Sequence, residues 1–494
     1  MNKVRDESFF GQFSVDLYNQ LFFSSSLRND GSSTFGKSKK RHWYPKVSGA
    51  WEITQQPVFY GIKNWLSFAK IRAAYGEAGQ QPDPYPSGYL WQTAYSTTIY
   101  TDSDITPNAG NSPFAWGYSG FHSSYIRGND EINPQRTKEW ETGIDLGFWN
   151  DRIGLGLTYY DSRTEDVIYS MPIAPSTGYQ QQLKNGGIIS NRGLEVSLNL
   201  QPLTTKTLTW DVGVNWARNK NRVVELDGAE YIFLQGFETS CYAQVGQPMS
   251  IFRGPDFIRF GRGSTVQDAE GDLVNIDKAY SGWEKGDLYI AEDGFPLYDP
   301  EERITGNPNP DWTAGIRNTV HLFKKLSISA LFDIKQGGDV YNGTRGALRY
   351  FGIHNETDVE GTDLEGVTRR GNLHTFEGKG PGAGTRVFLD QDNWYAFGLG
   401  NAFFGPNSPY VEDGSYVKLR EVSVSYKFTH PRLSYYTGLE DIDIRLSGRN
   451  LYTWTDYSGI DPETNISGNE NWRGLDYFNN PHTRSIILTF RFNY

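Results

Sequence analysis

The sequence predicts an all-β protein of the antiparallel transmembrane β-barrel type. Aromatic residues make up 15% of the 494 residues, and 54 glycines against 3 methionines favour strands joined by turns over helices. Apolar and polar residues alternate along many short segments, as they do in strands with one apolar face. The connections between these segments are alternately short and long, which is typical of barrels that cross a membrane.

The clearest alternation lies at 138–149. Trp140 and Ile144 fall on its apolar face, and Glu141 falls on its acidic face. A similar run at 153–160 comes after a short link, which predicts a tight hairpin. The other predicted strands bring the total to about thirteen and cover 9–17, 21–28, 44–54, 65–75, 194–201, 208–216, 312–322, 326–335, 416–428, 442–451 and 483–494.

The connections of the predicted sheet differ in length. Short turns are expected near Asn19, Pro57, Asp151, Pro202, Lys324 and Pro431, and long connections cover 29–43, 76–137, 162–187, 217–310, 336–413 and 452–483. Connections this long are rare inside compact soluble domains. A membrane barrel accounts for them, because its periplasmic turns are short and its extracellular loops are long.

The final strand comes after a long connection and is therefore expected to run toward the periplasm. It ends in an alternating series that contains Phe490, Phe492 and Tyr494. Such a terminus is expected to act as the signal for outer-membrane assembly and to place an aromatic ring in the interfacial girdle. The alternative is an ordinary edge strand that happens to end the chain.

The number of strands indicates part of a larger barrel. Single-chain bacterial barrels have an even number of strands, and the large plugged transporters have about 22. The 494 residues are therefore expected to form the C-terminal part of such a barrel, without the export signal, the plug and the first strands. Within this part, the apolar phase slips by one residue between Leu419 and Val422, which predicts a β-bulge.

Composition argues against several other classes of protein. The net charge of −11, without a basic run, argues against a nucleic-acid partner. The single cysteine, Cys241, excludes an internal disulfide and a Cys-based zinc site. The mean hydropathy of −0.58, without a long apolar run, argues against a transmembrane helix but is compatible with membrane strands.

No catalytic residue, metal site or cofactor is expected. Glu139, Glu141 and Asp145 share one strand face with nothing to distinguish an acid from a base, as on the wall of a water-filled lumen. The acidic stretch 268–277 resembles a calcium loop only loosely, because it lacks the closing bidentate Glu. The glycine-rich segment 378–384 lacks the Lys-Ser/Thr ending of a phosphate loop.

Aromatic side chains in the long connections are the candidate ligand-binding groups. Their rings could stack on sugars or on apolar ligand faces. The alternative is that they pack the connections against one another. The candidates are Trp91, Trp116, Tyr118, Trp394, Tyr395 and Trp472.

Several segments resemble the SusC/RagA family of TonB-dependent outer-membrane transporters. The similarity is spread in family order over nearly the whole chain. The segments are SSLRNDGSSTFG at 25–36, WYPKVSGAWEIT at 43–54, NPQRTKEWETGIDLGFWNDRIGLGLTYYDSRTEDVI at 133–168, IISNRGLEVSLNLQP at 188–202, GNPNPDWTAGIRNTV at 306–320, DGSYVKLREVSVSYKF at 413–428, IRLSGRNLYTWTDYSGIDPE at 444–463 and PHTRSIILTFRFNY at 481–494.

The resemblance implies uptake of an oligosaccharide or a peptide across the outer membrane of a Gram-negative bacterium. It also implies outer-membrane lipid around the barrel, energy from the TonB complex through the missing plug, and a SusD-like lipoprotein over the extracellular loops. The connections 76–137 and 336–413 are the expected contact surfaces. The alternative is a surface binding or adhesion β-protein without transport, either a barrel or a soluble lectin-like chain with short connections at both ends.

Overall fold

A computed structural model describes residues 4–35, 41–81, 95–99, 119–123, 126–237, 239–267, 271–466, 468 and 472–494. Its largest sheet has 14 strands in the order β1-β2-β3-β4-β8-β9-β10-β11-β18-β19-β26-β27-β29, with β7 (Ile126–Arg127) beside β10. The strands are β1 (Asp6–Leu17), β2 (Leu21–Ser32), β3 (Arg41–Glu52), β4 (Leu66–Gln80), β8 (Gln135–Phe148), β9 (Ile153–Pro172), β10 (Gln181–Thr204), β11 (Leu208–Leu226), β18 (Pro310–Leu322), β19 (Leu326–Gly337), β26 (Tyr416–Phe428), β27 (Asp441–Trp454) and β29 (Ser485–Asn493). Each predicted strand appears in this series.

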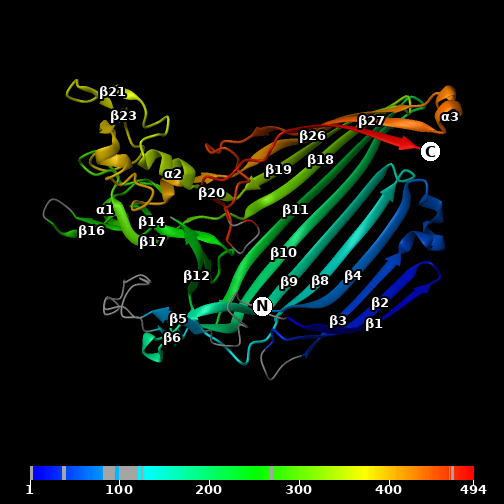
Figure 1. Ribbon diagram of the computed structural model, residues 1–494, viewed down its shortest axis with the longest axis horizontal. Helices are drawn as coiled ribbons and strands as arrows, with labels where there is room; N and C mark the ends of the chain where they lie inside the picture. Colours follow the sequence, from blue (N-terminus) through cyan, green and yellow to red (C-terminus); the bar gives the residue numbers. More distant parts are fainter. Residues whose placement is uncertain are drawn as a thin grey trace. The chain divides into compact units, whose positions relative to one another are not determined.

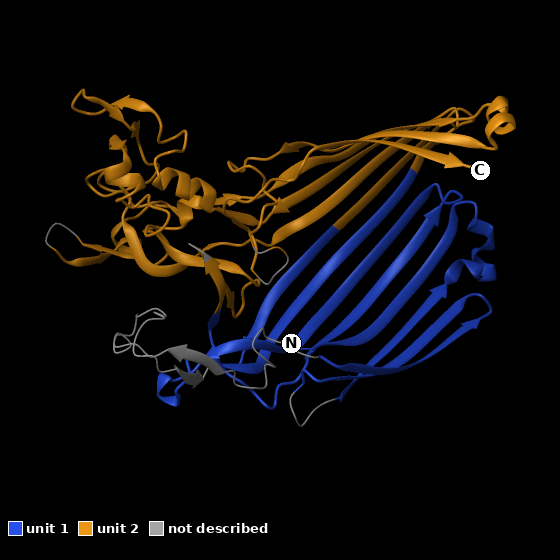
Figure 2. Ribbon diagram, in the orientation of Figure 1, with its two compact units in different colours: residues 1–200, 217–232 blue, residues 201–216, 233–494 orange. Residues whose placement is uncertain are grey.

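The chain divides into two compact units (Figure 2). Unit 1 contains residues 1–200 and 217–232. In it β1, β2, β3, β4, β8, β9 and β10 each pair antiparallel with the next strand and run side by side (Figure 1). The turn between β8 and β9 has positive φ at Trp149, Asn150 and Asp151, which confirms the predicted tight hairpin. A longer link between β3 and β4 holds the 3-10 helices η1 (Ile53–Gln55) and η2 (Pro57–Ile62).

The strands of unit 1 have one apolar face and one polar face. On β8 the apolar face carries Trp140, which is 63% exposed, and the register places Tyr75 and Asp161 as its cross-strand neighbours. The next residue, Glu141, lies on the opposite face and pairs with Arg72 of β4. Because side chains alternate along a strand, one register assigns every residue of the sheet to a face.

Several strands are longer than the sequence predicts, among them β11, which was expected at 208–216 and continues to Leu226. The region 162–187 was expected to be a long connection, but β9 continues to Pro172 and β10 begins at Gln181. Their pairing in this part passes through two register irregularities around Gly187. The alternation of apolar residues fades here because both faces are polar, so the hydrophobic pattern ends before the hydrogen-bonded ladder does.

Unit 2 contains residues 201–216 and 233–494. In it β18, β19, β26, β27 and β29 each pair antiparallel with the next strand. On β19, Leu331 faces Glu421 while Phe332 faces Leu419, which leaves Arg420 as an extra residue of β26. This confirms the predicted β-bulge. The link between β26 and β27 holds α3 (Pro431–Thr437).

The long connections of unit 2 form a folded part of their own, here called the loop lobe (233–309, 338–415 and 455–484). Its core includes Cys241, Phe252, Tyr341, Tyr410 and Leu475, all buried. Its elements are β12 (Tyr231–Phe237), β13 (Thr239–Gln244), β14 (Ile251–Phe257), β15 (Thr265–Gln267), β16 (Leu273–Asn275), α1 (Ile276–Ala279), β17 (Tyr298–Gly306), β20 (Asp339–Asn342), α2 (Gly343–Tyr350), β21 (Glu360–Thr362), β22 (Thr368–Arg370), β23 (Asn372–His374), β24 (Val387–Leu389), η5 (Gln391–Tyr395), η6 (Ser408–Tyr410), β25 (Val411–Asp413) and β28 (Leu475–Asp476). The connections of unit 1 contain β5 (Tyr95–Ile99), β6 (Ser119–Ser123) and η4 (Pro175–Thr177).

In the part of the chain that the structure describes, no helix is both long enough and apolar enough to cross a membrane.

The two faces of β26 should differ in their tolerance of charge. Val424 lies on the apolar face and is 40% exposed, whereas Ser425 lies on the opposite face. An arginine that faces lipid costs about 2–4 kcal/mol near the middle of the bilayer. We therefore expect Val424→Arg to reduce the amount of folded, heat-modifiable protein in outer-membrane fractions, and Ser425→Arg to change it little. Equal losses for the two variants would contradict this assignment of the faces.

Candidate functional site

The polar face of unit 1 contains a hollow lined by small side chains. The register places Ser14, Ser24, Ser48, Ala74 and Glu141 in one row across β1, β2, β3, β4 and β8. Because four of these five side chains are small, they leave a cavity of about 550 Å³. Strands of a membrane barrel carry polar residues on the lumen side, so this hollow belongs to the inner wall.

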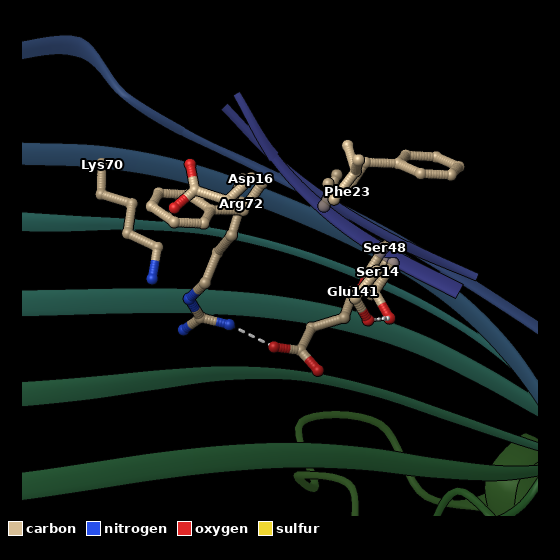
Figure 3. A pocket seen from close by; sticks show the side chains of 14 residues that line it. Ser14, Asp16, Phe23, Ser48, Lys70, Arg72 and Glu141 are labelled. Carbon is tan, nitrogen blue, oxygen red and sulfur yellow. Dashed lines mark hydrogen bonds and ion pairs between the residues drawn. The ribbon is translucent and has the colours of Figure 1, made fainter. Parts of the chain in front are cut away.

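Arg72 is the central charged group of this hollow. Its guanidinium donates to Glu141 and to Thr158, and its Nε lies 3.4 Å from a carboxylate oxygen of Asp145. Figure 3 shows Arg72 directed toward Glu141, while the apolar side chain of Phe23 points away from both. Glu141 and Asp145 were predicted to line a lumen wall, and the structure shows both as ion-pair partners of an arginine of the neighbouring strand.

Unit 2 contains a second charged group, which we call the loop clamp (Asp333, Lys418, Arg420, Asp461 and Glu463). The Lys418 side chain is 3% exposed, and its ammonium lies 2.6 Å from Asp461 and also binds Glu463. Arg420 donates to Asp333 at 2.8 Å and 2.6 Å and pairs with Glu463. The clamp therefore fastens the connection after β27 to the polar ends of β19 and β26.

The β-bulge brings a further charged residue to the face that carries the loop clamp. Side chains of a regular strand alternate between faces, so Lys418 and Arg420 share a face while Glu421 would lie on the other. The extra residue at Arg420 changes the phase, and Glu421 then faces the same side, where it pairs with Arg445 at 2.5 Å. Charged residues at 418, 420 and 421 are thereby gathered on the polar face.

The carboxylates of the clamp are held in their ionised form. Burial alone would raise the pKa of Glu463, but hydrogen bonds from Arg420 and Lys418 lower it to about 2. Burial alone would also raise the pKa of Asp461, but the hydrogen bond and charge of Lys418, together with the backbone N–H groups of Glu463 and His482, lower it. Asp461, Glu463 and His482 bring possible metal-ligating atoms within 4.8 Å of one another. Since the clamp cations already neutralise both carboxylates, this grouping is explained by the ion pairs.

A second cavity lies beside the loop clamp in unit 2. It has a volume of about 360 Å³ and is lined by Lys335, Asp339, Tyr416, Glu463 and Arg473, together with backbone-rich segments near Pro308 and Gly474. The Tyr416 hydroxyl donates to Glu463 at 2.9 Å, which joins the clamp to the cavity. We call this space the clamp cavity.

Two of the predicted ligand-binding aromatics pack inside the loop lobe. Trp394 and Tyr395 are buried in a cluster with Phe257, Val387 and Leu389, and the Trp394 ring stacks on that of Phe257. Trp472 is partly buried against the core around Cys241. Trp91, Trp116 and Tyr118 lie outside the described residues. Packing therefore accounts for the positions of Trp394 and Tyr395, and ligand contact by any of the six stays a prediction.

The C-terminal strand has the alternation that the sequence predicts. Phe490 and Phe492 lie on the exposed apolar face of β29, in the same phase as Leu488, and Tyr494 comes after them. Their role as an assembly signal stays a prediction.

Other singled-out residues have structural partners. The thiol of Cys241 is buried, and burial raises its pKa to about 12, which makes it unreactive. Asp277 of the acidic stretch accepts the backbone N–H groups of Gly261 and Gly263 at 2.6 Å and 2.8 Å, so it organises a turn. Residues 268–270 of that stretch lie outside the described part of the chain.

The sequence interpretation missed the loop clamp. Lys418 and Asp461 are 43 residues apart, and no spacing rule connects a strand residue to a residue in a long connection. A signal was nevertheless present, because Lys418 and Arg420 are charged residues on the polar face of a strand at the point where the apolar phase slips. Unpaired charges at such a position call for acidic partners from elsewhere.

The fold and the charged polar face define the wall of a β-barrel membrane protein. Residues 2–251 match the family described as "TonB dependent receptor-like, beta-barrel", and the chain belongs to this family. It is thus a TonB-dependent-receptor barrel protein of the outer membrane of a Gram-negative bacterium.

Two of the similar proteins cover the chain almost completely, and a third covers half of it. TonB-dependent receptor P3 of Formosa agariphila is 27% identical over 501 residues, which is 99% of this chain and 45% of the relative. TonB-dependent receptor SusC of Bacteroides thetaiotaomicron is 29% identical over 245 residues, which is 49% of this chain and 22% of SusC. The structure of the RagAB peptide importer in the "closed-closed" state has a similar fold, with a TM-score of 0.69 and 20% identity over 99% of this chain and 47% of that one. The chain spans about half the length of the relatives that match it throughout.

The loop clamp should make stability depend on pH through Glu463. Its pKa is lowered from 4.5 to about 2, so the stabilisation is complete above about pH 4.5 and is lost as the pH falls toward 2. We expect Glu463→Gln to reduce the free energy of unfolding of the full-length protein at pH 6 by about 3 kcal/mol. Its thermal unfolding midpoint should fall accordingly. The difference from wild type should disappear near pH 2.

The exposed Glu365 of the loop lobe provides the matched control. Glu365→Gln should leave the unfolding midpoint unchanged across the same pH range. A Glu463→Gln difference that is the same at pH 2 and pH 6 would show that the charge of Glu463 does not stabilise the fold.

Proposed function

We propose that this chain forms part of the barrel of a TonB-dependent transporter that takes up an oligosaccharide or a peptide. The observation that carries the proposal is the polar inner wall in a member of the receptor barrel family. The hollow around Arg72 and the clamp cavity present charged and hydrogen-bonding groups on the polar face, as a path for a hydrophilic solute requires. The apolar outer face is suited to outer-membrane lipid.

Two partners are part of the proposal. Energy comes from the TonB complex through a plug that lies outside these 494 residues, and a SusD-like lipoprotein covers the loops. The names of the relatives, which include TonB-dependent receptors and SusC, support both. The loop lobe offers a surface for the lipoprotein, because Phe351 and Phe404 are exposed beside Tyr350 and Phe403 within the connection 336–413. Exposed aromatic patches of this kind favour protein contact.

The class of solute is proposed from the chemistry of the wall. Oligosaccharides and peptides both carry many hydrogen-bonding groups and are too large for simple porins. One relative is named SusC and one similar structure is that of a peptide importer, so both solute classes are represented among similar proteins. No residue acts as a catalyst in this proposal, which agrees with relatives that are named as receptors.

Removal of the full-length protein from its bacterium tests the proposed function. We expect the deletion strain to lose growth on, and uptake of, at least one fluorescently labelled oligosaccharide or peptide, and a TonB-deficient strain to lose the same uptake. Reintroduction of the full-length wild-type gene should restore it.

The same set of labelled oligosaccharides and peptides distinguishes transport from adhesion. If the deletion strain takes up the whole set normally but binds less of one labelled solute at its surface, the proposed function is wrong and a binding or adhesion protein is the better description.

A further inference from the structure

We propose that the clamp cavity binds a single carboxylate group of a solute through Lys335 and Arg473. The inference rests on the proposed function, because the solute is taken to be one that the transporter handles. The cavity lies between the polar ends of β19 and β26 and the connection after β27. All of its lining residues belong to unit 2.

The carboxylates that line the cavity already have hydrogen-bond donors. Glu463 accepts hydrogen bonds from Tyr416, Lys418 and Arg420. Asp339 accepts the backbone N–H of Asn307 at 2.6 Å. These acidic groups are therefore occupied by the protein itself and are poorly suited to recognise a cation.

The two cations that line the cavity have no such partners. The Lys335 ammonium makes no ion pair or hydrogen bond with any residue that the structure describes, and it lies 5.6 Å from the centre of the Tyr416 ring. The guanidinium of Arg473 likewise has no ion pair or hydrogen bond within the described parts of the chain. An ammonium has three N–H donors and a guanidinium has five, so both are available to a ligand in the cavity.

Glu463, Asp413 and Asp339 attract Lys335 electrostatically, Glu463 most strongly, but none of them forms an ion pair with it. The Oδ1 of Asp413 accepts the backbone N–H of Ser415 at 2.9 Å and the Ser415 hydroxyl at 2.6 Å. Gly414 lies between Asp413 and Ser415 in the sequence. A Cβ atom added at Gly414 would lie 3.0 Å from the Lys335 ammonium. The ammonium thus lies beside Gly414 in a residue that lines the cavity.

The ligand group that best fits these two cations carries one negative charge. A carboxylate accepts charge-assisted hydrogen bonds from both Lys and Arg, and such bonds are about twice as strong as neutral ones. The carboxylates of Asp339 and Glu463 lie on the same walls and disfavour a doubly charged phosphate. A uronic acid and the C-terminus of a peptide both provide the required group, and the two proposed solute classes therefore share one recognition chemistry.

Binding at this site is coupled to the loop clamp. Glu463 contributes to the wall of the cavity and also binds Lys418 and Arg420. Lys335 comes from β19, whereas Arg473 comes from the connection that the clamp holds. A carboxylate can bridge the two cations only while the clamp keeps that connection in place.

Titration calorimetry on the full-length protein in detergent tests the inference with two pairs of probes. The first pair is trigalacturonic acid and its methyl ester, and the second is tetra-alanine with a free C-terminus and its C-terminal amide. We expect one acid to bind more tightly than its neutral partner. We also expect Lys335→Met and Arg473→Met each to reduce the affinity for that acid at least about tenfold, as for the loss of a charged hydrogen bond.

Matched variants separate recognition from folding. Lys335→Arg keeps the charge and should retain most of the affinity, and Lys325→Met, at the other end of β19, should have no effect. All variants should keep the heat-modifiable gel shift of a folded barrel. The acid that responds identifies the source of the carboxylate as a uronide or a peptide.

Two results would overturn the inference. One is that neither acid binds the wild-type protein more tightly than its neutral partner. The other is that an acid binds but Lys335→Met and Arg473→Met leave its affinity unchanged while both variants are folded. Uptake lost in the deletion strain but unaffected by Lys335→Met would refute this site and leave the proposed function intact. Lys335-dependent binding without any loss of uptake on deletion would refute the proposed function alone.

Discussion

The structure depends on one constraint, which is that every peptide group inside a bilayer must find its hydrogen-bond partner within the protein. An unpaired N–H or C=O in hydrocarbon costs several kcal/mol, so membrane strands must pair on both sides. The strands from β2 to β27 meet this requirement through ladders on both sides, while β1 and β29 pair on one side within the described residues. Since the ladder fixes the register, each side chain is assigned either to lipid or to the polar face, and a shift of one residue would exchange the two.

On the polar face, this register determines which charged side chains lie together. Arg72 joins acidic residues of the next strand, and the bulge at Arg420 collects charges that regular alternation would separate. A nearly fully buried ammonium such as that of Lys418 is stable only with both of its carboxylates, because removal of one partner from a buried pair typically costs about 3–5 kcal/mol. The main effect of the loop clamp is thus to fix one arrangement of the connection after β27, rather than to add net stability.

Local periodicity in the sequence predicts the strands of this fold but few of its distant contacts. Alternation identifies the strands, and the phase slip near Leu419 identifies the bulge, because both are properties of consecutive residues. The outer parts of β9 and β10 are missed because their side chains are polar on both faces. The loop clamp is missed because Lys418 meets Asp461 across 43 residues. Aromatic composition also cannot distinguish ligand contact from packing, and Trp394 is packed.

The shared residue Glu463 links the clamp to the cavity in thermodynamic terms. If the connection after β27 leaves the wall, Arg473 moves away from Lys335 and the cavity loses one of its two cations. A ligand that needs both cations binds only the clamped state, and it must therefore stabilise that state by the difference in its two binding free energies. The coupling is reciprocal, so any partner that holds this connection against the wall raises the affinity for the ligand by the same factor. Ligand binding in the clamp cavity and the position of the connection after β27 are therefore coupled in one equilibrium.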